Sequence, residues 1–224
     1  MLTFKPDADE ARTRWEHFWN GELWKRPVVI AGATKDPARW VDPYSERYYR
    51  AVNGQVEEQL ARLDAYFENA IFLGEHMPWF APDFGPDQCA AFFGAQFHFS
   101  ESSRHTNWVY PVIDDWDAAL PLVFDEQNPT FQRLLAYTRR VAEHARSRYL
   151  VAGIDMHSNA DILSALRGPQ RFCLDFYDYP EQVGRAMRDV RRAYRPIIEA
   201  VRAAGNMGPP NGCVQYGVWH PRSF

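Results

Sequence analysis

Apolar positions recur at helical spacing in four stretches of the chain and, over a shorter length, in a fifth. The longer stretches are residues 7–19, 52–67, 128–145 and 180–204, and the short one is residues 161–166. Asn128-Pro129 is typical of a helix start, because proline fits the first helical position. Asn20-Gly21 is typical of a helix end. The pattern therefore predicts five helices.

Four short apolar runs separate these helices, at residues 27–33, 70–74, 149–154 and 212–217. Continuous apolar runs of this length suit strands that are buried on both faces, as in a parallel sheet. Strands that alternate with helices predict right-handed parallel βα units. A closed (β/α)8 TIM barrel needs about 250 residues and eight such units. We therefore expect an α/β fold, a single barrel domain over residues 1–224 that holds only the first four units and is C-terminally truncated.

Residues 75–116 differ from the rest of the chain. They contain many aromatic residues, prolines and glycines, but they show no sustained period. We interpret this stretch as a functional loop or insertion after the second strand, with a small hairpin near residues 96–100.

Composition narrows the class of protein. Of the 224 residues 46% are hydrophobic, which is enough for a sizeable core, and the formal net charge is −4. That charge gives no reason to expect nucleic acid or an anionic membrane as a partner. No uncharged apolar run approaches the ~20 residues of a membrane helix. The three widely spaced cysteines and the polar first ten residues predict a cytoplasmic protein without a signal peptide.

Catalytic side chains of (β/α) barrels follow the carboxyl ends of the strands. This rule selects Glu75, His157 and Asp155 as candidate catalytic residues, and His76, Asn159, Asp161, Gln215 and Trp219 as candidates for substrate binding. Lys35, Arg39 and Arg47 are the cations that the first two loops offer. For Glu75 we expect partial burial to raise the pKa and suit the residue to general acid catalysis. The alternative is that Glu75 only caps a loop or helix.

Asp155 and His157 are two residues apart, so in an extended segment both side chains face the same way. Such a pair could begin a zinc or other transition-metal site, or it could form a structural hydrogen bond. Two ligands do not define a tetrahedral site. We therefore assign no metal ligand within this chain.

Several segments resemble the uroporphyrinogen decarboxylase superfamily, in its divergent branch of decarboxylase-like and corrinoid methyltransferase-like proteins. The segments are residues 70–78, Asp83-Phe-Gly-Pro86, Phe93-Gly94, residues 108–116, residues 161–168, Asp175 and residues 178–181. They occur in the family's order over residues 15–220. The resemblance implies that Glu75 takes the place of the family's catalytic aspartate, and that Asp83 belongs among the substrate-binding residues.

This chain departs from the decarboxylases of that family in two respects. The family's Arg-Gln-Ala-Gly-Arg segment, which grips substrate carboxylates, does not follow the first strand, and Ser164 stands at the position of an active-site tyrosine. The resemblance therefore implies zinc-assisted methyl transfer involving a corrinoid or a thiol more than decarboxylation. The zinc and corrinoid ligands are then expected beyond Phe224.

Two other functions stay open on the sequence. One is a uroporphyrinogen-type tetrapyrrole decarboxylase, which needs no cofactor, and the other is a non-catalytic ligand-binding barrel. The expected partners are a small-molecule or tetrapyrrole substrate, a corrinoid protein in the methyltransferase case, and a second copy of the chain in a homodimer.

Overall fold

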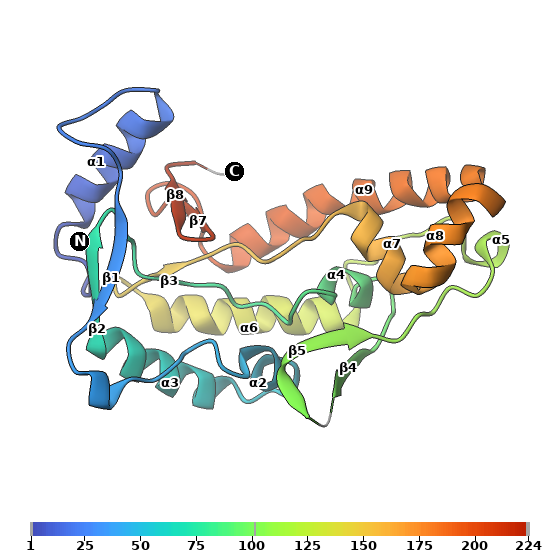
Figure 1. Ribbon diagram of the computed structural model, residues 1–224, viewed down its shortest axis with the longest axis horizontal. Coiled ribbons are helices and arrows are strands. Elements are labelled where there is room, and N and C mark those ends of the chain that lie inside the picture. The colour runs from blue at the N-terminus through green and yellow to red at the C-terminus, as the bar shows by residue number, and fades with distance from the viewer. Residues whose placement is uncertain (1, 101, 223–224) are drawn as a thin grey trace.

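The computed structural model describes residues 2–100 and 102–222, and its fold is mixed α/β (Figure 1). The helices are α1 (Ala8–Trp19), α2 (Arg47–Val52), α3 (Val56–Asn69), α4 (Gln88–Ala91), α5 (Trp116–Ala119), α6 (Pro129–Ala145), α7 (Asn159–Arg167), α8 (Pro169–Asp178) and α9 (Pro180–Ala204). The strands are β1 (Ile30–Thr34), β2 (Ala70–Gly74), β3 (Trp79–Phe80), β4 (Phe97–Ser100), β5 (Ser103–Val109), β6 (Leu150–Val151), β7 (Cys213–Gln215) and β8 (Val218–His220). Among the described residues no helix is long and apolar enough to cross a membrane.

The predicted helices are confirmed, with small changes at their ends. The Asn128 side chain accepts hydrogen bonds from the N–H groups of Thr130 and Phe131, so α6 begins where the Asn-Pro signal places it. The predicted helix over residues 52–67 is α3, which starts only at Val56 because Asn53-Gly54 delays it, and α2 before this turn was not predicted. Helix α8 was not predicted, since the stretch between Gly168 and α9 is too short to show a clear period.

The first two predicted strands pair with each other in antiparallel fashion, so the prediction of parallel neighbours is wrong for them. Ile30 lies opposite Gly74 and Thr34 opposite Ala70. The chain leaves β1 at Thr34 and returns through α2 and α3 to the same end of the ribbon, which makes the pair antiparallel. The prediction of burial on both faces is also wrong: Ile30 is 45% exposed. An apolar run alone does not tell a buried strand from a half-exposed ribbon.

A parallel pair lies instead between β3 and β6. Trp79 pairs with Leu150 and Phe80 with Val151, and α6 forms the crossover between the two strands. Beyond β6, Gly153 N–H donates to the Val214 carbonyl, which places β7 beside the continuation of β6. The fourth predicted strand is a hairpin of β7 and β8, because Tyr216 and Gly217 both have positive φ and turn the chain.

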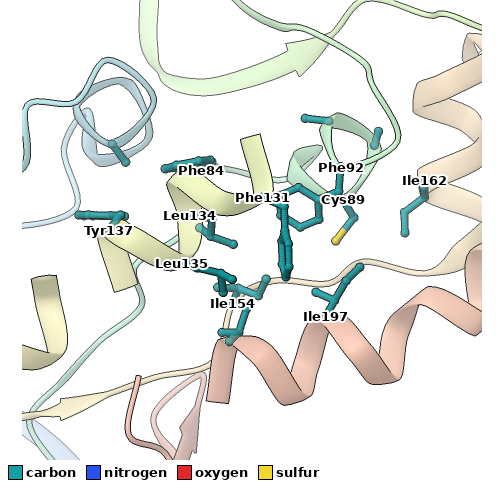
Figure 2. Packing of buried hydrophobic residues seen from close by; sticks show 14 of the residues in the cluster. Phe84, Cys89, Phe92, Phe131, Leu134, Leu135, Tyr137, Ile154, Ile162 and Ile197 are labelled. Carbon is teal, nitrogen blue, oxygen red and sulfur yellow. The ribbon is translucent and has the colours of Figure 1, made fainter. Parts of the chain in front are cut away.

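Most of the core lies around α6. Its buried face packs against α3 and α9, and Figure 2 shows Phe131, Leu134 and Leu135 of α6 beside Ile154 and Ile197. The stretch that was predicted as a loop or insertion also enters this core. It contains β3, α4 and the β4–β5 hairpin, and its Phe84, Cys89 and Phe92 side chains are fully buried. The expected hairpin near residues 96–100 is confirmed.

Candidate functional site

Two acidic residues follow the parallel strands β3 and β6. Asp83 lies three residues after β3 ends, and Asp155 lies four residues after β6 ends. Because parallel strands bring their carboxyl ends to one edge, the two following segments run side by side (Figure 1). The two carboxylates are close enough for Asp155 to raise the pKa of Asp83. This edge is the candidate site.

Asp83 is almost completely buried, with a side-chain exposure of 4%. Its Oδ1 atom has no hydrogen-bond partner among the described residues, and its Oδ2 lies 3.6 Å from Nη2 of Arg47. Burial raises the pKa of Asp83 to about 6; Arg47 opposes this change and Asp155 adds to it. Asp83 can therefore hold or release a proton near neutral pH.

Arg47 connects Asp83 with an open cleft. Its guanidinium lies over the rings of Tyr44 and Tyr48 and donates from Nη2 to the Tyr48 hydroxyl at 2.7 Å. The cleft has a volume of about 400 Å³ and is lined by Asp42, Tyr44, Ser45, Arg47, Tyr48, Trp79 and His105. Among the described residues the guanidinium has no other hydrogen bond, so its Nε and Nη1 donors are available to a ligand.

Asp155 and His157 lie at the same edge and interact with each other. His157 Nε2 is 3.2 Å from Asp155 Oδ2, and the His157 N–H donates to Asp155 Oδ1 at 3.0 Å. The expectation of an extended segment is wrong, because His157 has a φ of 50° and the chain turns there. The Tyr216 hydroxyl also faces Asp155: burial and then the Asp155 carboxylate raise the pKa of this tyrosine.

Glu75 does not belong to this edge, and the expectation of a raised pKa is wrong. Its side chain is 1% exposed and accepts hydrogen bonds from Arg14, from both Nη atoms of Arg26 at 2.7 and 2.9 Å, and from Val29 N–H at 2.8 Å. Burial acts to raise the pKa of Glu75, but these donors outweigh it and lower the pKa. Glu75 thus holds α1 and the residues before β1 against the end of β2.

The other predicted residues have contacts of their own. His76 Nδ1 bonds to the Ala31 carbonyl in the β1–β2 ribbon, and burial lowers the pKa of this histidine. Asp161 bonds to Ser158 in a capping box at the start of α7, and these bonds lower the pKa of Asp161. Asn159 donates to the Met187 carbonyl.

Of the two predicted residues near the end of the chain, one lies at the candidate edge. Gln215 donates to the Ile154 carbonyl at 3.4 Å, directly before Asp155. Trp219 is buried in a second apolar cluster and donates to the Asn211 carbonyl. The structure therefore brings together Asp83, Asp155, His157 and Gln215 of the predicted set.

The prediction from sequence did not include Tyr48 or Tyr216, and it gave Arg47 only as one of three loop cations. Arg47 and Tyr48 belong to α2, which was not predicted, and Tyr216 belongs to the turn between β7 and β8, inside the fourth predicted strand. An Arg-Tyr pair at the start of a short helix carries no spacing signal of its own. The ion pair of Arg47 with Asp83 places Arg47 and its neighbour Tyr48 at the site, and the interaction of Tyr216 with Asp155 places Tyr216 there.

No group of three His, Cys, Asp or Glu side chains in the described part of the chain is placed to hold a metal ion. Asp155 Oδ2 and His157 Nε2 lie 3.2 Å apart, and these two side chains alone do not supply the four ligands of a tetrahedral zinc site.

Comparisons with known proteins give no further identification. No protein-family model, no curated protein and no solved structure matches this chain. The resemblance to the uroporphyrinogen decarboxylase superfamily stays a prediction.

Proposed function

We propose that this protein is a carboxy-lyase of the uroporphyrinogen decarboxylase type, which acts on an anionic small molecule such as a tetrapyrrole. The carrying observation is Asp83, a buried carboxyl with one oxygen free of hydrogen bonds and a pKa raised to about 6. A decarboxylase needs a proton donor at the carbon that loses CO2. A carboxyl group whose pKa is raised to about 6 keeps a proton in a fraction of the molecules near neutral pH, and this fraction can meet that need.

The proposed reaction assigns one task to each group. Arg47 binds a substrate carboxylate through its two available donors, since a guanidinium pairs well with carboxylates. When the bond between carbon and the departing carboxylate breaks, its electron pair stays on the carbon and takes the proton of Asp83. CO2 leaves, and the Asp83 carboxylate regains a proton from solvent. Asp155 favours the protonated form of Asp83 before the step.

The barrel expected from the sequence is part of this proposal. The parallel pair β3–β6 with its α6 crossover, and β7 beside the continuation of β6, are the arrangement that one side of a (β/α) barrel would have. The acids follow the carboxyl ends of the strands, where barrel enzymes carry their catalytic groups. In this proposal β1 and β2 form an appended ribbon and are not barrel strands.

Zinc-assisted methyl transfer, which the sequence resemblance favours, has less support from the described side chains. Methyl transfer with zinc requires thiolate or imidazole ligands that converge on one point. At this edge the histidine bonds to an aspartate, and Cys89 is buried with its thiol pKa raised by burial. We derive no step through zinc or a corrinoid from these residues.

The test is CO2 release from uroporphyrinogen, or from simpler carboxylated pyrroles such as porphobilinogen, under anaerobic conditions. We expect turnover by the native protein and a loss on the order of 10²-fold or more in Asp83→Asn, because the amide cannot supply the proton. Asp64→Asn is the matched control, since Asp64 pairs with Arg148 and His144 away from this edge. Binding without CO2 release would favour the ligand-binding barrel, and full activity in Asp83→Asn would refute the assignment of the acid.

A further inference from the structure

The buried amide of Gln88 joins the two segments that carry the acids. Gln88 is the first residue of α4 and is fully buried. Its Oε1 accepts the backbone N–H of Phe84 at 3.0 Å, directly after Asp83, and its Nε2 donates to the backbone carbonyl of Asp155 at 2.8 Å. The Gln88 side chain thus bonds to the backbone of Asp155 and to the backbone of Phe84, the residue after Asp83.

The other side of Phe84 is held in the same way. The Asn107 side chain, which is also buried, donates to the Phe84 carbonyl. Gly85 allows this contact: its φ is +113°, and a Cβ atom there would lie 2.4 Å from Asn107 Oδ1. Both backbone groups of Phe84 are therefore bound by side chains, and the position of Asp83 is fixed by its neighbour.

Helix α4 is itself anchored in the core, so Gln88 cannot move freely. Cys89, Ala90 and Ala91 are buried, and Figure 2 shows Cys89 among Phe131, Ile162 and Ile197. A four-residue helix has little stability of its own and depends on this packing. The core therefore holds the Gln88 amide in place between the segment of Phe84, four residues before it, and the segment of Asp155, 67 residues after it.

We propose that Gln88 is a positioning residue that sets the separation of Asp83 and Asp155, an inference that rests on the function proposed for Asp83. An amide suits this task because one end accepts and the other donates, and neither end adds charge beside two carboxylates. Losing it leaves a buried N–H and a buried carbonyl without partners, so water enters and the two segments separate. Entry of water reduces the burial of Asp83, and separation of the segments weakens the effect of the Asp155 charge. Both changes lower the pKa of Asp83.

The groups that face Asp83 determine how this can be measured. They are Arg47, Tyr44 and Tyr48 from α2 and the segment before it, Tyr137 from α6, and Asp155 and Tyr216 from the segments after β6 and β7. Four effects set the pKa of the Asp83 carboxyl: its burial, the Arg47 charge, the Asp155 charge and the backbone N–H of Asp83 itself. Of these, Gln88 controls burial and the distance to Asp155, whereas Arg47 is held independently by Tyr48.

The experiment is a pH titration of the Asp83 carboxyl carbon by nuclear magnetic resonance in the full chain, together with hydrogen exchange of the Phe84 amide. In Gln88→Met, which keeps the volume but loses both hydrogen bonds, we expect the pKa of Asp83 to fall by about one and the exchange protection of Phe84 to be lost. Asn69→Leu is the control: Asn69 is a buried amide that also bonds twice, to Asp36 near β1, and we expect no change at Asp83.

A second variant covers the case in which Gln88→Met does not fold. Gln88→Asn keeps an amide that is one methylene too short to span both segments, and we expect the same two changes at smaller size. An Asp83 pKa and a Phe84 exchange rate that match the native protein in a folded variant would overturn the proposal. Neither the Asp83 pKa nor the Phe84 exchange rate is measured with a substrate. The positioning role of Gln88 and the decarboxylase activity can therefore fail independently of each other.

Discussion

Glu75 and Asp83 are both buried carboxylates, and they lie on either side of the short strand β3. Glu75 receives hydrogen bonds from two arginines and a backbone N–H. Asp83 has one arginine at 3.6 Å, a second carboxylate nearby and one oxygen that no group in the described part of the chain hydrogen-bonds. Burial acts to raise the pKa in both places, yet the pKa of Glu75 is lowered and that of Asp83 is raised.

The difference between them shows that burial alone does not mark a catalytic acid. A buried carboxylate that is saturated with donors stays ionised and holds elements together. A buried carboxylate with too few donors keeps its proton to a higher pH, which is the property that general acid catalysis uses. Substitutions at the two positions should therefore have opposite consequences for stability and for chemistry.

The largest effect should follow from Glu75→Gln. The substitution removes the buried counter-charge of Arg14 and Arg26 and leaves Arg14 only the exposed carboxylate of Glu10, and breaking a buried pair in this way costs about 3–5 kcal/mol. Denaturant unfolding measures the change. Glu57→Gln is the matched control, because Glu57 pairs with Arg140 at the surface and such a pair contributes at most about 1 kcal/mol. Equal losses of unfolding free energy in the two variants would show that the ion pairs of Glu75 do not stabilise the contact of α1 with the end of β2.

The second effect is a pH dependence of stability that Asp83 should add. A raised pKa means that the folded protein binds the proton more tightly than the unfolded chain does, so this group makes stability fall as pH rises from about 4 to about 6. Glu75 has the opposite sign: its lowered pKa adds stability above its ordinary pKa, and that stability is lost as pH falls.

Unfolding of the native protein and of Asp83→Asn over pH 4–7 isolates the Asp83 contribution. The difference in unfolding free energy between native protein and variant should decrease by about 2 kcal/mol across this range, because most of the contribution of a pKa raised from 3.8 to about 6 is still present at pH 4 and almost none is left at pH 7. A difference that is constant with pH would mean that Asp83 titrates like an exposed aspartate. The comparison with Glu75 would then lose its basis.

Five helices, α1, α3, α6, α7 and α9, could be predicted from the sequence because their signals are local. The Asn128-Pro129 start of α6 and the apolar stripe of α9 need no knowledge of the rest of the chain. Strand pairing is not local. The runs at residues 27–33 and 70–74 are as apolar as a buried parallel pair would be, but they form an exposed antiparallel ribbon. The true parallel strand, Trp79–Phe80, is too short to stand out among aromatic neighbours.

The residues of the candidate site also divide into those with a local signal in the sequence and those that only the tertiary fold brings together. The rule that acids follow strand ends found Asp155 and His157, and the sequence resemblance supplied Asp83. The rule also selected Glu75, because a sequence shows a carboxylate after an apolar run but does not show the arginines that bind it. Arg14 is 61 positions away in α1, and Gln88 is 67 positions from the carbonyl that it binds. Such contacts depend on the tertiary fold.

The smallest effect concerns the charges around Asp83, and it tests whether pairing causes the contrast with Glu75. Arg47 lowers the pKa of Asp83, so Arg47→Met should raise it further, by about one. Asp155 raises it, so Asp155→Asn should lower it by about 0.5 or less, as the weaker of the two charge effects. The asparagine keeps an oxygen for the His157 N–H, so the turn after β6 is preserved. Carboxyl-carbon titration measures both. Shifts in the same direction would mean that the variants act by loosening the packing, since only charge gives opposite signs at one carboxyl group.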